Sequence, residues 1–495
     1  MTAIDASSTV NSDSSQTKSS GDILGSIAVW ITTTEHKRIG RLFMRGGFFW
    51  LLGVVGSGVA LGIERIDSNS SLFPTNSIVQ LFSFFRTGLA IGVLAPLLIG
   101  VSIAIVPLKI GAQSISFARM ALFGFYSWLI GSAVVIIAII GNGGPSGGDP
   151  QMVDAYLLGV GLILIGLLFA AISVGTTVIC ARRPGLALSD MSVFSWSVFV
   201  GSVGLVLTLP IHLGSVIYLA VDHHYGRLAF GGNYGIDKWL GDAFSQPQTF
   251  IYLIPVLGVL AEIASPNESM RDVARMGGFI GVGVLSTAVL GAVTRTPHLF
   301  EWSGSFSDKI TSAIPYAMFN LLPILGVLIV LAVSLLAIKS ESAQMSASLV
   351  PALLGVGMIF TGMVGYAIQM IAPANLGGTV FEEGVFVYVG YGAVLVVIGA
   401  ISHWSSELRG RLLPSEAVIG LGVAGFAATV LASLPYLIVG FADQPANSTS
   451  DFQYEGPQAL WSICVTVGHV LMALVIIGFS ALILKPQSSQ ARSSS

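Results

Sequence analysis

The hydrophobic residues of this chain are gathered in long runs that short polar stretches separate. The runs at 196–221, 310–338 and 456–484 each exceed the roughly 20 apolar residues that an α-helix needs to cross a bilayer. Turn and charge signals, such as Gly-Gly-Pro at 143–145, mark the connections between runs. The pattern predicts an all-α integral membrane protein.

Twelve membrane-spanning helices are predicted in all. Their approximate limits are 43–63, 79–108, 118–142, 155–181, 192–221, 247–265, 275–295, 310–338, 347–372, 382–402, 415–441 and 457–484. The longest loop, 222–246, is too short for a soluble domain of its own. We therefore expect one twelve-helix membrane domain at 28–486, between polar and disordered tails at 1–27 and 487–495.

The composition agrees with a membrane location. Hydrophobic residues make up 54% of the 495 positions and charged residues only 9%, whereas a soluble domain has about a quarter charged residues. The 59 glycines suit helices that approach one another closely in lipid. The net charge of −3, without a large basic patch, argues against a nucleic-acid partner. Cys180 and Cys464 lie in apolar runs, where we expect them to be small packing residues.

Lysine and arginine predict the orientation, because they are enriched in cytoplasmic loops. With the N-terminus in the cytoplasm, 16 of them fall on the inner side, 5 on the outer side, and Arg86 within a span. An even number of spans then places both termini inside. The first residues lack the basic segment and apolar core of a secretory signal, and no transit peptide is apparent. We expect a bacterial or archaeal plasma membrane.

Several local motifs resemble those of haem-copper oxidase subunit I (cytochrome c oxidase subunit I), and they occur in order along the chain. The sequence WITTTEHKRIG at 30–40 is similar to the W-x-T-T-x-D-H-K-x-I-G motif before the first span of that family. The segments 80–82, 106–112, 183–196 and 386–389 are similar to later family motifs. The resemblance implies the twelve-helix fold of subunit I, two haems, copper, and other respiratory subunits as partners.

The same alignment replaces the family's metal ligands. The family holds its haems and copper with histidine nitrogens, which are good ligands for iron and copper. Its haem-ligand positions fall on Phe85, Val385 and Val387, and its copper-ligand positions fall on Gln246, Leu290 and Gly291. None of the seven histidines falls on a ligand position. We therefore expect neither haem nor copper in this chain.

The proton routes of the family are replaced as well. An aspartate and an asparagine of one route correspond to Ser114 and Ala121, and the lysine of the other route corresponds to Phe319. Gln248 stands where the family has a proton-relay glutamate. Buried ionisable groups are costly in lipid and are kept for function. Their joint replacement indicates that catalysis has been lost as a whole.

The remaining polar residues near the ligand positions form a candidate buried network of Arg86, Gln246, Gln248, Glu382 and Glu383. Two roles are open for Arg86. Its guanidinium either occupies the polar region where a haem would lie, with or without a bound anion, or extends towards the outer face of the membrane. Glu382 and Glu383 either cap the N-terminus of the tenth span, where the helix dipole attracts carboxylates, or pair with Arg86 or Arg295. Gln246 and Gln248 are expected to link helices by hydrogen bonds.

Three classes of function follow from these observations. The first is a non-catalytic subunit I-like component of a respiratory complex, with a structural or assembly role beside other membrane subunits or a ligand-complete paralogue. The second is a cytochrome c or quinol oxidase that reduces oxygen and pumps protons, against which the missing ligands argue. The third is an ion-transporting or a lipid- or quinone-binding membrane protein, for which Arg86 leaves an anion route open.

Overall fold

The structure is a computed structural model that describes residues 32–67, 72–264, 271–340, 346–449 and 456–484. The tails predicted at 1–27 and 487–495 lie outside the described residues. Within the described part, helices account for almost all regular structure, and the β pairing consists of isolated bridges such as the one between Phe300 and Ile371. The chain is therefore all-α, as the sequence predicted.

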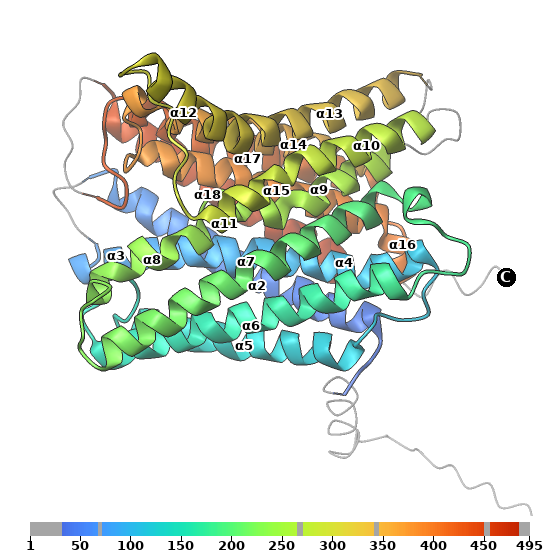
Figure 1. The fold of residues 1–495 in the computed structure, drawn as a ribbon, viewed down its shortest axis with the longest axis horizontal. Helices are drawn as coiled ribbons and strands as arrows, with labels where there is room; N and C mark the ends of the chain where they lie inside the picture. Colours follow the sequence, from blue (N-terminus) through green and yellow to red (C-terminus); the bar gives the residue numbers. More distant parts are fainter. Residues whose placement is uncertain (1–31, 68–71, 265–270, 341–345, 450–455, 485–495) are drawn as a thin grey trace, which may run out of the picture.

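Twelve helical segments of the described residues are long and apolar enough to cross a membrane, which confirms the predicted number of spans. They run roughly parallel to one another along the long axis of the molecule (Figure 1). The first six spans are α2 (His36–Glu64), α3–η1–α4 (Thr75–Ile110), α5 (Ala118–Ile140), α6 (Pro150–Cys180), α7 (Val193–His224) and α8–η4–α9 (Gly235–Ala264). The last six are α10–α11 (Arg271–Thr294), α12–η5–α13 (Phe306–Ser340), α14 (Leu349–Gln369), α15 (Val380–His403), α17 (Ser415–Gly440) and α18 (Gln458–Leu484). Three short helices, η2 (Leu188–Asp190), η6 (Ala372–Ala374) and α16 (Ser405–Arg409), lie in connections.

Three spans are less regular than the hydrophobic runs suggested. The second and eighth contain π-helical segments, η1 (Gly88–Leu94) and η5 (Ala317–Leu321), and such segments are frequent at functional sites. The seventh is divided at Ser286 into α10 (Arg271–Leu285) and α11 (Thr287–Thr294). Hydrophobic periodicity has no signal for a single extra residue in a turn, so the sequence did not reveal these features.

The segment 222–246, which the sequence analysis treated as a loop, is partly helical. It contains η3 (Gly232–Tyr234), α8 (Gly235–Leu240) and η4 (Gly241–Phe244), which lead directly into α9 (Gln248–Ala264). Asp222 accepts hydrogen bonds from the backbone N–H groups of Ala229 and Phe230, at 2.8 and 2.9 Å, and so fixes the turn before these helices. This segment contributes one side of the cavity described below.

Close backbone contacts between glycines hold several pairs of helices together. A Cβ atom on Gly40 of α2 would stand 2.5 Å from the carbonyl oxygen of Gly100 in α4. The same holds for Gly124 of α5 against Gly166 of α6, at 2.6 Å. Because lipid supplies no hydrophobic drive for helix association, such close packing is a main source of stability in membranes.

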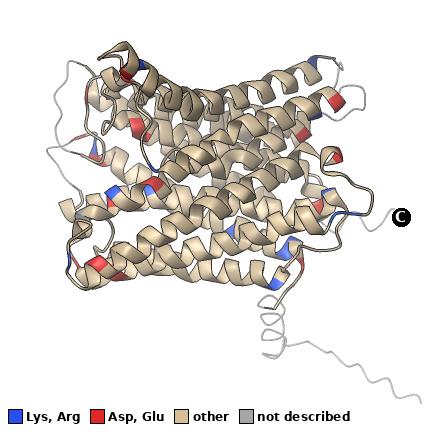
Figure 2. Cartoon of the chain, in the orientation of Figure 1, with Lys and Arg blue, Asp and Glu red and all other residues tan. Residues whose placement is uncertain are grey.

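Two spans lie at the centre of the bundle. The apolar windows of α3–η1–α4 and α15 are entirely buried, whereas only 39% and 33% of those of α17 and α18 are buried. The first and last spans, α2 and α18, contact each other and close the outer layer. Charged side chains gather mainly at the two ends of the bundle (Figure 2), as expected for a protein whose flank faces lipid. We refer below to the end that carries the connections after α2, α7, α11 and α14 as the Arg65 end.

Candidate functional site

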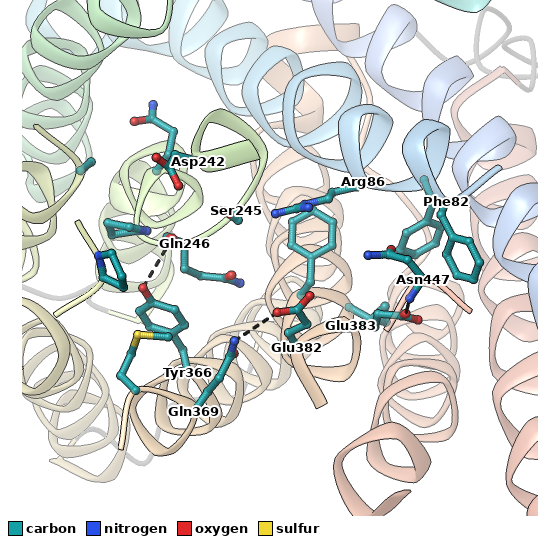
Figure 3. A pocket seen from close by; sticks show the side chains of 18 of the residues that line it. Phe82, Arg86, Asp242, Ser245, Gln246, Tyr366, Gln369, Glu382, Glu383 and Asn447 are labelled. Carbon is teal, nitrogen blue, oxygen red and sulfur yellow. Dashed lines mark hydrogen bonds between the residues drawn. The ribbon is translucent and has the colours of Figure 1, made fainter. Parts of the chain in front are cut away.

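A cavity of about 240 Å³ lies in the Arg65 half of the bundle, among the spans that carry the family's metal-ligand positions. Its apolar wall includes Phe82, Phe85, Phe386 and Val387. Its polar wall includes Arg86, His212, Asp242, Gln246, Gln248, Arg295, Gln369, Glu382, Glu383, Asn447 and His469. All five residues of the candidate polar network thus line one cavity, and Figure 3 shows how most of these side chains surround it.

The positions that correspond to family ligands fall in two groups. Phe85, Gln246, Gly291 and Val387 line the cavity. Val385 and Leu290 do not appear among its lining residues. Val385 is completely buried and packs against Gly365 of α14, where an added Cβ atom would stand 2.8 Å from the valine side chain. Leu290, in contrast, is 53% exposed. The cavity therefore lies where the resemblance places the haem and copper region. At the ligand positions that line it, the chain has hydrocarbon side chains, a glycine and the Gln246 amide.

Gln246 and Gln248 connect helices, but through different atoms. The Tyr366 hydroxyl of α14 donates to the backbone carbonyl of Gln246, at 3.5 Å. The side-chain oxygen of Gln248 lies 3.3 Å from Nε2 of His212 on α7. The Nε2 groups of both glutamines have no hydrogen-bond partner. The Gln248 side chain thus links α9 to α7, whereas Gln246 contacts α14 through its backbone alone, and both amide N–H groups are left without an acceptor.

Two histidines that correspond to no family ligand position lie against this cavity. His212 is buried and contacts Gln248 as described above. Nδ1 of His469, on α18, lies 2.6 Å from the Tyr391 hydroxyl, and its ring lies edge-on to Phe85 with ring centres 5.8 Å apart. Whether these side chains point into the cavity depends on which faces of α7 and α18 are turned towards it, and the sequence does not reveal this.

Arg65 and Glu383 form an ion pair beside the cavity. Two guanidinium nitrogens of Arg65 lie 2.7 and 2.9 Å from the two carboxylate oxygens of Glu383. The guanidinium also lies 5.0 Å from the ring centres of both Phe82 and Tyr436. Burial disfavours the charge on Arg65, but Glu383 and Tyr436 outweigh that effect, so the pKa of Arg65 is raised. Arg65 is one of the five basic residues that the orientation count placed on the outer side, and nothing in the sequence indicated this pair.

Glu382 and Arg86 face the cavity without forming a pair with each other. The Glu382 carboxylate accepts from the Gln369 amide, at 3.3 Å, and from the backbone N–H of Gly378, at 3.4 Å. Arg86 has no hydrogen bond or ion pair with any residue that the structure describes. Among the described residues, no salt bridge joins Glu382 or Glu383 to Arg86 or Arg295, because Glu383 binds Arg65 and Arg295 binds Asp242.

Arg295 joins three segments at the mouth of the cavity. It donates to the Ser215 hydroxyl of α7, at 2.6 Å, and to the backbone carbonyl of Trp239 in α8. Its Nε lies 3.6 Å from a carboxylate oxygen of Asp242 in η4. Asp242 belongs to the segment that was expected to be a loop, so neither its helical setting nor its partner was predicted.

The side chains at the family's ligand positions do not fit haem or copper. Phenylalanine and valine have no donor atom for a metal, and an amide is a weak ligand for copper or haem iron compared with imidazole. Among the described residues, no group of three or more His, Cys, Asp or Glu side chains is arranged to hold a metal ion. No chemical step is therefore assigned to a metal or a haem at this site.

The residues that replace the proton routes have structural contacts. The Ser114 hydroxyl donates to the backbone carbonyl of Thr34, at 3.3 Å, and Ala121 is completely buried. The Phe319 ring, in η5, packs against the His298 ring with ring centres 4.4 Å apart. These contacts show how the three positions are filled in this chain.

The fold and the site together define a twelve-span membrane bundle with a mixed polar and apolar cavity near one end. A family model described as Cytochrome C and Quinol oxidase polypeptide I matches residues 38–481. The chain belongs to this family, as the sequence motifs indicated.

Curated relatives agree with this assignment. The chain is similar to cytochrome c oxidase subunit 1 of Corynebacterium diphtheriae, with 28% identity over 291 residues that cover 54% of this chain and 50% of that protein. It is also similar to quinol oxidase subunit 1 of Bacillus subtilis, with 26% identity over 298 residues that cover 56% of this chain and 45% of that protein. The matched region thus spans about half the length of these relatives.

A solved structure shows the same fold. The chain superposes on a chain of a haem-copper terminal oxidase dimer with a TM-score of 0.68 and 15% sequence identity, over 91% of this chain and 85% of that chain. At this level of identity the likeness concerns the fold alone.

Proposed function

We propose that this protein is a non-catalytic, subunit I-like membrane component of a terminal-oxidase-type respiratory complex, with a structural or assembly role. We propose further that it binds neither haem nor copper. The observation that carries the proposal is the replacement of the ligand side chains at Phe85, Val385, Val387 and Gln246 within an otherwise maintained fold.

Two features of the bundle support a structural role. Close glycine contacts hold neighbouring spans together, and the Arg65–Glu383 pair links the end of the first span to the tenth. Fold alone does not determine function, so the loss of the site removes the main argument for oxidase activity. Family membership supports partners among other respiratory membrane subunits, including a ligand-complete paralogue, in a bacterial plasma membrane.

The cofactor part of the proposal is tested by spectroscopy. The chain is produced alone in cells that assemble haem proteins, purified in detergent, and measured as a reduced-minus-oxidised spectrum together with copper analysis. We expect background haem and copper per chain. One equivalent of haem would contradict the proposal, and His469→Ala would then show whether His469 is the ligand, because it is a histidine of the cavity wall.

The assembly part is tested by co-purification from the native membrane. A tagged chain should retain other oxidase-type subunits after mild solubilisation, and its deletion should reduce the amount of the assembled oxidase. A chain that purifies alone, with a deletion that leaves the oxidase unchanged, would contradict a role in the complex.

A further inference from the structure

Four arginines gather at the end of the bundle opposite the Arg65 end, where α2 begins. Arg41 and Arg45 belong to the first turns of α2, and Arg409 and Arg411 belong to the connection between α15 and α17. We call these four residues the basic cluster. The start of α2 and the short helix α16, which ends at Arg409, lie at the same end of the bundle (Figure 1).

The contact between α2 and α18 brings the two pairs of arginines together. Phe48 on α2 packs against Phe479 on α18, with ring centres 6.0 Å apart. One turn closer to this end of the bundle, Arg45 precedes Phe48, and Leu482 follows Phe479. The Arg411 guanidinium donates to the backbone carbonyl of Leu482, at 2.9 Å. The connection before α17 is therefore fastened to the end of α18, beside the arginines of α2.

The cluster concentrates positive charge without an ion pair to offset it. Among the described residues, no carboxylate forms an ion pair with Arg41, Arg409 or Arg411. The Nη1 group of Arg409 is buried and has no hydrogen-bond partner in this part of the chain. Burial and the positive charges of Arg411, Arg45 and Arg41 lower the pKa of Arg409. The arginines thus repel one another, and one donor is left without an acceptor.

Two carboxylates lie near the cluster, and both have partners outside it. An oxygen of Glu35 lies 2.5 Å from Nε of Arg38, although the charge of Glu35 also attracts Arg41. The Ser406 hydroxyl donates to the exposed carboxylate of Glu407, at 2.6 Å. An external group with negatively charged oxygens would accept from Arg409 and reduce the repulsion between the arginines.

The face of α2 that carries the cluster continues as an apolar surface. Arg45, Phe49 and Leu52 follow one another at intervals of four and three residues, so they share one face of the helix. Phe49 is 71% exposed and Leu52 is 40% exposed. Leu412, directly after the second pair of arginines, is 75% exposed. A basic surface at the end of the bundle is therefore continuous with a lipid-facing apolar surface.

From this arrangement we infer that the basic cluster binds the phosphate group of an anionic glycerophospholipid, with an acyl chain along Phe49 and Leu52. The phosphate oxygens accept from Arg409, and the neighbouring arginines attract their charge. A zwitterionic headgroup carries a cation that the cluster repels, so a headgroup with a net negative charge is preferred. The inference goes beyond the proposed function and does not depend on it, because the cluster lies away from the cavity.

The test counts the lipids that remain on the full chain, purified in a neutral detergent, by native mass spectrometry. The probes are dioleoylphosphatidylglycerol, which is anionic, and dioleoylphosphatidylcholine, which has the same acyl chains and no net charge. We expect one tightly bound phosphatidylglycerol per chain and about tenfold weaker binding of phosphatidylcholine. Equal binding of the two lipids by the unaltered chain would overturn the inference without any variant.

Inorganic phosphate separates a lipid site from a site for the free ion. At the concentration of the lipid it should leave phosphatidylglycerol bound, because the acyl chain contributes to the affinity through its contact with the apolar face. Displacement of the lipid by an equal concentration of phosphate would show a site for the free ion and would overturn the assignment to a lipid.

Two variants assign the binding to the cluster. Arg409→Met and Arg41→Met should each weaken phosphatidylglycerol binding about fivefold, as expected for the loss of one basic side chain at a membrane surface. Arg119→Met is the matched control, because Arg119 is exposed at the start of α5, at the same end of the bundle and outside the cluster. Unfolding midpoints equal to that of the unaltered chain show that each variant is folded.

Two further outcomes would contradict the inference. If Arg409→Met and Arg41→Met weaken phosphatidylglycerol binding no more than Arg119→Met does, the lipid binds elsewhere. If no phosphatidylglycerol remains bound to the unaltered chain, the counter-charge comes from another source, such as an acidic segment of a partner protein. Neither outcome concerns the haem content, so the proposed function is tested separately.

Discussion

Arg65 and Glu383 join the first span to the tenth through two hydrogen bonds of 2.7 and 2.9 Å, although 318 positions separate them in the chain. The Arg65 side chain is only 1% exposed, and it also donates to the backbone carbonyl of Ser448, at 2.9 Å. Because Arg65 lies just after α2, the pair fixes how the end of this helix meets α15 and the connection after α17.

Replacement of Arg65 by methionine is expected to destabilise the protein strongly. The replacement removes both hydrogen bonds from Arg65 to the Glu383 carboxylate. The loss of one member of a buried ion pair lowers the free energy of unfolding by about 3–5 kcal/mol. The measurement is the thermal unfolding midpoint in detergent. Arg275→Gln is the control, because the Arg275–Asp272 pair is partly exposed and lies on one helix, where such a pair contributes about 0.3–0.5 kcal/mol. Similar midpoints for Arg65→Met and the unaltered chain would show that the pair has no stabilising role.

Gly40→Ala is expected to destabilise the contact between α2 and α4. The added methyl group would stand 2.5 Å from the Gly100 carbonyl oxygen and 2.8 Å from Cβ of Ala104, so the helices must separate. Overpacking of this kind costs about 1–3 kcal/mol. Gly56→Ala, on the same helix, has no atom within 4 Å of the new methyl group and should be neutral or slightly stabilising. Equal unfolding midpoints for the two variants would contradict the proposed contact.

Arg295→Gln is expected to loosen the helices that cover the cavity mouth. Arg295 holds α8 through the Trp239 carbonyl and η4 through Asp242, and both contacts weaken when the charge is removed. The measurement is amide hydrogen exchange of residues 235–244, which should become faster. Arg227→Gln serves as the control because the Arg227 guanidinium lies in the same connection, 5.6 Å from the Tyr225 ring. Unchanged exchange of residues 235–244 in Arg295→Gln would show that contacts other than those of Arg295 hold α8 and η4 in place.

Cys180 offers a direct test of the predicted orientation. It is exposed at the last residue of α6, and the arginines that follow it predict that this end of the bundle faces the cytoplasm. In a Cys464→Ser background, in which Cys180 is the remaining cysteine, a charged maleimide should label inverted vesicles and spare right-side-out vesicles. The reverse pattern would place the N-terminus outside.

The number and order of the spans could be predicted because each has its own apolar run of sufficient length. The details that depend on neighbouring spans could not. The break at Ser286 and the π-helical turns of η1 and η5 leave no periodic signal in an apolar run. The short helix α8 lies in a stretch that mixes turn-forming and helix-forming residues, so the sequence is equally compatible with a loop there.

The candidate site was predictable in location and only partly in composition. Alignment to family motifs led to Phe85, Gln246 and Val387, which do line the cavity. Arg65, Asp242 and His469 were not linked to it, since their contribution depends on contacts between spans distant in sequence. Arg65 stands one residue beyond the end of α2, where an arginine is ordinarily a surface charge. Only the packing of α15 and α17 against that point reveals its burial.

The contact between α2 and α18 has a consequence for biosynthesis. Gly58 lies against the ring of His469, and Gly62 lies against Thr466, so the first of the twelve spans packs against the twelfth, which is synthesised after the other eleven. Until the ribosome has passed α18, the cavity lacks the wall that His469 contributes, and Phe85 lacks the ring that packs against it. The cavity is therefore completed only after α18 has been synthesised, and a nascent chain that stalls before residue 458 lacks this wall.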